Sequence, residues 1–504
     1  MTRAERRGLG LLFGASLVIK LIPVVLPDLV AFDSDEAVQG LMAQHVLAGR
    51  FPLFIYGQSV GGGLEHLLAV PFFALLGPSV ATLRLAALLM VLACEGLFYI
   101  AVCRLEDDVR QRLFALAAFI VCSPFFTSFN FHVYGTHLNN LLVCAGLGAV
   151  LARCRRTVLD HPVSLGLLVG LGFWVSNVVW MFVLAALVAV WVARLPFGPT
   201  PRRVCALVGG LVLAGAPRLV YWIAPGLWPQ TSVAGKFAPE LGGATLERAR
   251  ALVADAWVEY CCGALRDHGA LSALAAWLAL GAVVALAAAT VRRALARDSA
   301  AALPTFFLLV LALSGVATVL NRRTYDSGVR YLLVGQFFLA LAWARLAMRG
   351  PGAVARLRRA AGNLLFGLAV VGQVATITTP GPRPQPAPTA RLLRLLDQHG
   401  CKAGMADYWI AYSLWFLSGQ RFRPTPLYRD RHVAALGPER LQCHVLLVDD
   451  DPTLSPRLRA ERARNREFLH ARLTSLREVP RPYALARSDE FVVLFEGLAE
   501  PPRD

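Results

Sequence analysis

Long apolar stretches most constrain how this chain of 504 residues can fold. A helix needs roughly 20 mostly apolar residues to cross a bilayer. Eleven stretches come close to that length, at about residues 9–30, 80–103, 111–129, 136–152, 162–177, 178–194, 203–224, 270–291, 301–320, 329–347 and 360–378. Hydrophobic residues make up 56% of the chain and charged residues 16%, which excludes a soluble or disordered protein. The sequence therefore predicts a polytopic α-helical membrane protein with about eleven transmembrane helices.

The net charge of +17 could suggest nucleic-acid binding, but the distribution of the arginines gives another explanation. Every second junction between predicted spans is basic, beginning with the segment before the first span. The arginines at these junctions are Arg3, Arg6, Arg7, Arg104, Arg110, Arg112, Arg153, Arg155, Arg156, Arg194, Arg202, Arg203, Arg292, Arg293, Arg297, Arg345, Arg349, Arg356, Arg358 and Arg359. This alternation is typical of positive-inside topology. It predicts an inner (cytoplasmic) membrane protein with a cytoplasmic N-terminus and no nucleic-acid partner.

Three predicted outer segments are too long to be turns: residues 31–79, residues 225–268 and the part beyond about 380. We expect a transmembrane domain over 1–379 and an extracytoplasmic α/β domain over 380–504. The second begins with a proline-rich spacer, Pro380–Pro388, and is large enough to have a core of its own. Its pattern predicts helices at Thr389–Gln398 and Pro456–Leu476, and strands at His444–Asp449 and Phe491–Phe495.

Carboxylates gather at the start of the first outer loop, where Asp33, Asp35 and Glu36 precede an amphipathic helix of about fourteen residues. One explanation is helix capping, because acidic residues favour a helix N-terminus. Capping needs a single carboxylate, so a chemical role for the others stays open. Further along the loop, Gly61–Gly63 reads as a hinge, and Leu67–Leu76 is apolar but too short to span.

The order of short motifs resembles the GT-C glycosyltransferases, a group that includes the protein O-mannosyltransferases and the lipid A aminoarabinose transferases. The similarity extends to bacterial family-39-type membrane enzymes. The matching motifs are Asp35-Glu36-Ala37, Leu47-Ala48-Gly49-Arg50-Phe51-Pro52, Tyr56-Gly57-Gln58, Gly62-Gly63-Leu64-Glu65, Leu83-Arg84-Leu85, Tyr134-Gly135-Thr136-His137, Gly172–Ser176, Arg330-Tyr331-Leu332-Leu333, Ala406–Tyr412 and Phe416–Gly419. Each motif is short, and their order along most of the chain carries the resemblance.

The resemblance implies an enzyme that moves a sugar from a polyprenyl-phosphate donor to a glycan, lipid or protein acceptor at the outer face. It implies Asp35 as the catalytic base, with Glu36 and Asp33 as neighbours. An inverting transfer needs a carboxylate to remove the acceptor hydroxyl proton, whereas the phosphate leaving group needs positive charge. Arg330, at the predicted outer mouth of the tenth span, is expected to bind the donor phosphate, with Arg322 and Arg323 close by. An alternative role for such arginines is to reach toward the lipid interface.

Other positions are candidates for binding substrate: Tyr56, Gln58, Glu65, His137 and Tyr331. No cofactor is implied with certainty, although Glu65, His66 and His137 could hold a divalent metal. Cys401 and Cys443 precede predicted outer strands and could form a disulfide in an oxidising compartment.

Two other classes of protein are compatible with many apolar spans. A transporter or lipid-linked sugar flippase would show internal repeats and helices broken at the midplane, and the sequence has no such repeat. A sensor or assembly protein would not need acidic residues in the first outer loop. We therefore expect a glycosyltransferase surrounded by membrane lipids.

Overall fold

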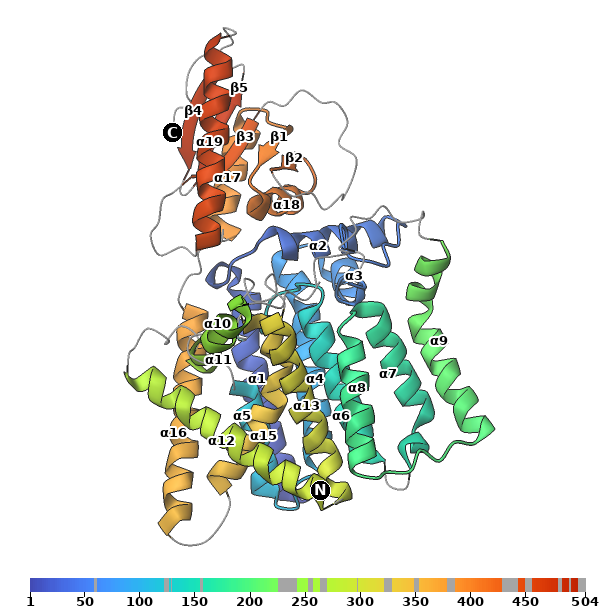
Figure 1. The fold of residues 1–504 in the computed structure, drawn as a ribbon. Coiled ribbons are helices and arrows are strands. Elements are labelled where there is room, and N and C mark those ends of the chain that lie inside the picture. The colour runs from blue at the N-terminus through green and yellow to red at the C-terminus, as the bar shows by residue number, and fades with distance from the viewer. Residues whose placement is uncertain are drawn as a thin grey trace. The chain divides into compact units, whose positions relative to one another are not determined.

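The computed structural model describes residues 1–58, 61–121, 127, 129–154, 157–224, 243–252, 257–262, 270–296, 298–320, 329–348, 353–378, 386–427, 443–448, 456–478, 483–488 and 491–496. The chain forms two compact units (Figure 1). The first, called here the helical unit, comprises Met1–Val24, Gln58–Glu65 and Arg84–Thr379. The second comprises Val25–Gly57, His66–Leu83 and Pro380–Asp504, and is called the outer unit after the side of the membrane that the sequence predicts for it.

A helix lies in each of the eleven predicted apolar stretches. These helices are α1 (Arg3–Val25), α4 (Val80–Val102), α5 (Val109–Val121), α6 (His137–Arg153), α7 (Pro162–Val175), α8 (Val179–Val192), α9 (Pro201–Ile223), α12 (Ala270–Leu295), α13 (Ala302–Leu320), α15 (Gln336–Met348) and α16 (Ala353–Thr378). Two short helices, α10 (Gly243–Ala251) and α11 (Trp257–Cys262), precede α12. Six of the described helices, namely α1, α4, α9, α12, α13 and α16, are long and apolar enough to cross a membrane. The protein is therefore a multi-pass membrane protein, and a total of eleven crossings stays a prediction.

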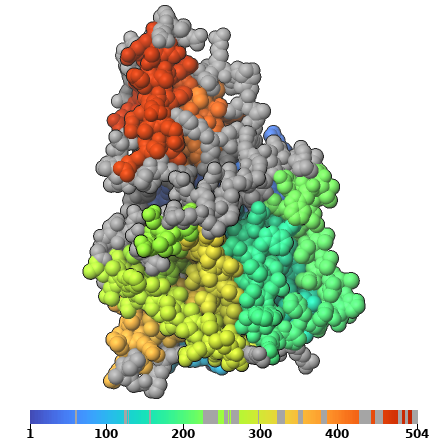
Figure 2. Space-filling view, viewed as in Figure 1, coloured from blue at the N-terminus to red at the C-terminus, as the bar shows by residue number. Residues whose placement is uncertain are grey.

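Helices α8 and α9 expose large apolar side chains on the surface of the helical unit, as expected for a surface that faces lipid. Large side chains on α8 and α9 are exposed, among them Trp180, Trp191, Leu213 and Ile223. Figure 2 shows these two helices at the surface of the helical unit. Exposure of such side chains would be costly in water and is favourable in hydrocarbon.

Aromatic stacking joins four helices inside the helical unit. The ring centroids of Phe98 and Phe119 are 4.6 Å apart, and those of Phe119 and Phe337 are 4.9 Å apart. Phe307 extends the stack at 5.1 Å from Phe337. Because these residues lie on α4, α5, α13 and α15, the cluster forms a core for these helices.

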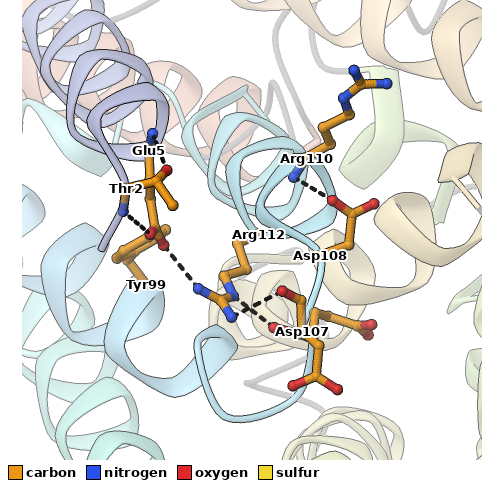
Figure 3. A network of polar contacts seen from close by, with 8 residues as sticks. Thr2, Glu5, Tyr99, Asp107, Asp108, Arg110 and Arg112 are labelled. Atoms are coloured by element: carbon orange, nitrogen blue, oxygen red, sulfur yellow. Dashed lines mark hydrogen bonds and ion pairs between the residues drawn. The ribbon is translucent and has the colours of Figure 1, made fainter.

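Ion pairs connect three chain segments that the arginine pattern places on the cytoplasmic side. Glu5 Oε1, at the start of α1, accepts hydrogen bonds from Tyr99 Oη at 2.6 Å and from Arg112 Nη1 at 2.9 Å (Figure 3). After α4, Glu106 Oε1 pairs with Arg345 Nε at the end of α15, at 2.7 Å. Both ion pairs therefore join segments that the arginine pattern predicts to lie on the same side of the membrane.

Backbone contacts of Gly61 and Gly62 connect two segments that the sequence predicts to lie on the outer side of the membrane. Gly62 N donates to Val175 O at 3.2 Å, and Gly61 forms a β-bridge with Ser176, in the turn between α7 and α8. A Cβ at Gly62 would lie 2.7 Å from the carbonyl oxygen of Trp174. Gly61 and Gly62, in the run expected to be a hinge, therefore pack closely against the turn between α7 and α8.

The outer unit contains a five-stranded sheet in the order β2-β1-β3-β5-β4. The strands are β1 (Ala403–Ala406), β2 (Arg423–Pro426), β3 (Cys443–Leu447), β4 (Tyr483–Ser488) and β5 (Phe491–Glu496). Strand β1 pairs in parallel with β2 and β3, whereas β5 pairs antiparallel with β3 and β4. The α/β architecture expected beyond residue 380 is present.

Three helices accompany the sheet: α17 (Pro386–Gln398), α18 (Tyr408–Leu417) and α19 (Pro456–Glu478). Leucines of α17, Ile410 and Leu414 of α18, and Val445 and Val493 of the sheet share one buried core. The expected proline-rich spacer is shorter than predicted, because Pro386–Pro388 begin α17. Residues 380–385 of that spacer lie outside the described residues.

The predicted first outer loop, residues 31–79, contributes α2 (Ser34–Leu47) and α3 (Leu64–Leu76). The length of α2 matches the expected helix of about fourteen residues, but its burial differs from an amphipathic pattern. Polar Gln39 and His45 are buried along with Val38 and Leu41. Helix α18 packs against α2 within the outer unit, which accounts for burial on more than one face of α2.

Candidate active site

The first turn of α2 is organised by Asp33. This residue is the N-cap of the helix, and its Oδ1 accepts hydrogen bonds from the backbone N–H groups of Asp35 at 3.0 Å and Glu36 at 3.2 Å. An N-cap side chain satisfies donors that have no partner within the helix. Asp33 is fully buried, so its described contacts fit the capping role.

Asp35 differs from its two acidic neighbours in exposure. Asp33 and Glu36 are fully buried, whereas Asp35 is only partly buried. Its Oδ1 accepts a hydrogen bond of 2.5 Å from the hydroxyl of Tyr408, the first residue of α18. Of the three carboxylates, Asp35 therefore combines access with a fixed position, the two properties that a general base needs.

Two more hydrogen bonds hold α18 against the same turn. The backbone N–H of Tyr412 donates to Ser34 Oγ at 3.0 Å, and Ser413 Oγ donates to the carbonyl oxygen of Phe32 at 3.0 Å. Both connections are buried and cross more than 370 positions of sequence, with separations of 378 and 381. The carboxylate turn is thus built from two distant parts of the chain.

Tyr56, a candidate for substrate binding, pairs with a residue that the sequence did not point out. Its hydroxyl lies 2.8 Å from Nδ1 of His45 on α2. Burial lowers the pKa of His45, as do the positive charges of Arg50 and Arg423, so the ring is neutral at pH 7. Burial raises the pKa of Tyr56, so the phenol keeps its proton and donates to His45 or to a ligand.

The residues that could hold a metal have other contacts. Glu65 Oε2 accepts from the backbone N–H of Gly135 at 2.6 Å, and His66 contacts Pro52 O through Nε2 at 2.9 Å. The ring of His137, at the start of α6, packs edge-on against Phe129 at 5.2 Å. Among the described residues, no three His, Cys, Asp or Glu side chains come together as a metal site requires.

The candidate arginines are only partly described. Arg330 and Tyr331 lie on the 3₁₀-helix η8 (Val329–Gly335), but their side chains are outside the described part of the structure. Arg322 and Arg323 lie outside the described residues altogether. Gln58 is half-buried in the helical unit. Binding roles for these residues stay predictions.

The sequence did not identify Tyr408 as a partner of Asp35. The motif Ala406–Tyr412 was noted for its resemblance, but nothing in its pattern connects it to the first outer loop. The motif does contain one local signal, Asp407, which caps α18 by accepting from Trp409 N at 2.9 Å. By contrast, the disulfide between Cys401 and Cys443 joins the two cysteines that the sequence put forward as a pair.

Comparisons with known proteins find the architecture but no close relative. No family model matches the sequence, and no curated protein matches it. The crystal structure of ArnT from Cupriavidus metallidurans in the apo state aligns with 99% of this chain and 100% of that chain, with a TM-score of 0.60 and 13% identity. The structure of the same protein bound to undecaprenyl phosphate covers 98% of this chain and 99% of that chain, with a TM-score of 0.63 and 15% identity.

The match with ArnT extends over both units and leaves almost no part of either chain unaligned. ArnT is a GT-C membrane glycosyltransferase, in agreement with the family that the motifs resembled. The protein has the GT-C fold of the membrane glycosyltransferases.

Proposed function

We propose that this protein is a glycosyltransferase that moves a sugar from a polyprenyl-phosphate-linked donor to an acceptor at the outer face of the membrane. The observation that carries the proposal is the Asp35 turn, a partly exposed carboxylate held by a buried cap and by α18. The ArnT fold supports the class of reaction, and the ArnT complex with undecaprenyl phosphate supports the class of donor.

In this proposal Asp35 is the general base. It removes the proton from an acceptor hydroxyl while the oxygen attacks the anomeric carbon from the face opposite the phosphate, and the sugar is transferred with inversion. The bond from the anomeric carbon to the phosphate oxygen breaks, and polyprenyl phosphate leaves as an anion. The leaving group needs no proton, so a single carboxylate is sufficient.

The donor phosphate requires positive charge near the base. We assign this role to Arg330, with Arg322 and Arg323 as further candidates, because a guanidinium group binds two phosphate oxygens at once. Tyr56, Gln58, Glu65, His137 and Tyr331 are proposed to contact the sugar or the acceptor. A glycan, a lipid and a protein are all compatible acceptors.

The orientation is also part of the proposal: a cytoplasmic N-terminus and an outer unit on the opposite side of the inner membrane. The alternating arginines support it. Further support comes from the contacts in the helical unit, which join Glu5 to Arg112 and Glu106 to Arg345, all at junctions predicted to be cytoplasmic.

The test is donor consumption by the purified protein in detergent. A radiolabelled polyprenyl-phosphate sugar is incubated with cell-envelope extract as the source of acceptor, and the release of polyprenyl phosphate and the labelled product are followed. We expect Asp35→Asn to lower kcat by about 10²- to 10⁴-fold, the usual contribution of a general base. Near-normal turnover by Asp35→Asn would remove Asp35 from this role.

The matched control is Glu467→Gln, which removes one negative charge from an exposed position on α19. We expect it to keep wild-type turnover. A protein that carries the labelled donor across vesicles without consuming it would instead be a transporter or flippase. That result would reject the proposed function.

A further inference from the structure

We infer that Tyr408 is a positioning residue for Asp35, and that helix α18 makes the folded sheet domain part of the reacting centre. The inference rests on the proposed function, because it assigns a role in the same reaction. The observation behind it is the packing of α18 against α2 inside the outer unit.

The contact itself restricts the carboxylate. Tyr408 Oη donates to Asp35 Oδ1 at 2.5 Å, a short distance for a hydrogen bond between two oxygens. A hydroxyl is a neutral donor, so this hydrogen bond orients the carboxylate and leaves it negatively charged. A general base has to keep that charge until it takes the proton.

Tyr408 is held rigidly on the side of the sheet domain. The preceding residue, Asp407, is buried and accepts from Asn465 Nδ2 at 2.6 Å, while the same nitrogen also donates to Leu447 O at 2.8 Å. The following residue, Trp409, donates through Nε1 to Glu461 Oε2 at 2.5 Å. The position of the phenol is therefore set by β3 and α19.

The other end of the contact is equally fixed. Hydrogen bonds join Ser34 to Tyr412 and Phe32 to Ser413, so α18 follows the backbone of the carboxylate turn. Farther along α2, a Cβ at Gly40 would come within 2.5 Å of the Phe416 ring. The absence of a side chain at Gly40 lets the two helices approach closely enough for Tyr408 to reach Asp35.

A structural contact and a positioning contact predict different outcomes when the hydroxyl is removed. A structural contact would lower stability and leave the kinetics of the surviving enzyme unchanged. A positioning contact would lower kcat with little change in the KM for the donor. It would also move the acidic limb of the kcat–pH profile to higher pH, because the donor favours the charged form of the carboxylate.

The experiment compares Tyr408→Phe with wild type in the donor-consumption assay with the full chain in detergent. We expect kcat to fall about tenfold and the acidic limb to rise by about one pH unit, the effect of losing one hydrogen bond to a charged group. In an Asp35→Asn background, Tyr408→Phe should cause no further loss. The control is Tyr483→Phe, which removes a phenol of β4 whose described partner is Arg477.

A second measurement does not depend on turnover. Hydrophobic carbodiimides react with protonated carboxyl groups, and peptide mass spectrometry reports the labelling rate of Asp35 at a fixed pH. We expect Tyr408→Phe to raise that rate severalfold, up to about tenfold for a shift of one pH unit, while Tyr483→Phe leaves it unchanged.

The outcomes separate the two proposals. A wild-type protein that consumes no donor, with labelling of Asp35 still dependent on Tyr408, rejects the proposed function and keeps the contact between the residues. An active wild type with unchanged labelling and an unchanged pH profile in Tyr408→Phe overturns the positioning role alone. A lower melting temperature with wild-type kcat would also overturn it.

Discussion

Buried carboxylates of the helical unit and the carboxylates at the start of α2 in the outer unit have different described contacts. In the helical unit, buried or half-buried carboxylates pair with cations: Glu5 with Arg112, Glu106 with Arg345, and Glu95 with Lys20. In the carboxylate turn of the outer unit, Asp35 accepts a hydrogen bond from a tyrosine hydroxyl, and Asp33 accepts from the helix backbone. The three ion pairs stabilise the packing of helices, whereas the contacts of the carboxylate turn fix the orientation of Asp35, as the proposed general base requires.

The two units also differ in the state of their described cysteines. Five cysteines described in the helical unit are free thiols: Cys94, Cys103, Cys144, Cys154 and Cys205. The outer unit has the disulfide between Cys401 and Cys443. A sheet of five short strands has a smaller core than the helical unit, and a cross-link limits the entropy of its unfolded chain.

The largest effect on stability is expected from breaking the ion pair between Lys20 and Glu95 in the apolar interior of the helical unit. Lys20 Nζ lies 2.5 Å from Glu95 Oε1, and both side chains are 1% exposed. Glu95→Ala leaves the ammonium group buried without a counter-charge, which costs about 3–5 kcal/mol in such pairs. Thermal unfolding of the full chain in detergent should show a correspondingly lower melting temperature.

The double variant Lys20→Met/Glu95→Leu is the control for this prediction. It removes both charges and fills the space with apolar atoms, which is often neutral for a buried pair. A double variant as unstable as Glu95→Ala would mean that the side chains matter for packing and not for charge. The comparison between the two units would then lose one of its three ion pairs.

The next effect concerns the disulfide of the outer unit. The bond closes a loop with a sequence separation of 42. Cys401→Ala/Cys443→Ala should therefore destabilise this unit by about 2–4 kcal/mol. Hydrogen exchange of the β3 amides in the full chain measures the loss, and Cys205→Ala, a change at an exposed thiol, is the control.

Exchange of β3 that is unchanged in the double alanine variant would contradict this prediction. The same would follow if Cys205→Ala accelerated exchange as much. In either case the sheet would owe its stability to its buried core, with Val445 and Val493 at its centre.

Much of the helical unit could be predicted from sequence because hydropathy directly reflects burial in lipid. Each apolar stretch contains a helix, and Ser176 and Asn177 mark the break between α7 and α8. The strands at β3 and β5 were predictable for a similar reason, since both are continuous apolar runs. These features are local, and each is encoded within one segment.

Several features of the outer unit could not be predicted from the sequence. Strand β2 reads Arg-Pro-Thr-Pro and has no alternating pattern, while α18 is buried on all sides and has no polar face. The contact of Tyr408 with Asp35 spans 373 positions and depends on two helices packing together. Such a contact leaves no periodic signal in a single sequence. The acidic residues could therefore be identified as candidates from the sequence, whereas Tyr408 could not be identified as the partner of Asp35.

The smallest expected effect separates the roles of Asp33 and Asp35. Asp33→Ala removes the cap of α2, which should cost about 1 kcal/mol, while Asp33→Ser keeps an oxygen that accepts from the same backbone donors. We expect Asp33→Ala to lower kcat modestly, because the first turn that carries Asp35 loosens, and Asp33→Ser to restore most of it.

The donor-consumption assay and the melting temperature together distinguish a capping role of Asp33 from a chemical role. If Asp33→Ser is stable but as inactive as Asp35→Asn, the carboxylate of Asp33 has a chemical role that its described hydrogen bonds do not reveal. If Asp33→Ser retains activity, the two acids divide their work: Asp33 holds the turn, and Asp35, oriented by Tyr408, remains the base. A short hydroxyl can replace a cap but cannot accept a proton at neutral pH, so one substitution distinguishes the two roles.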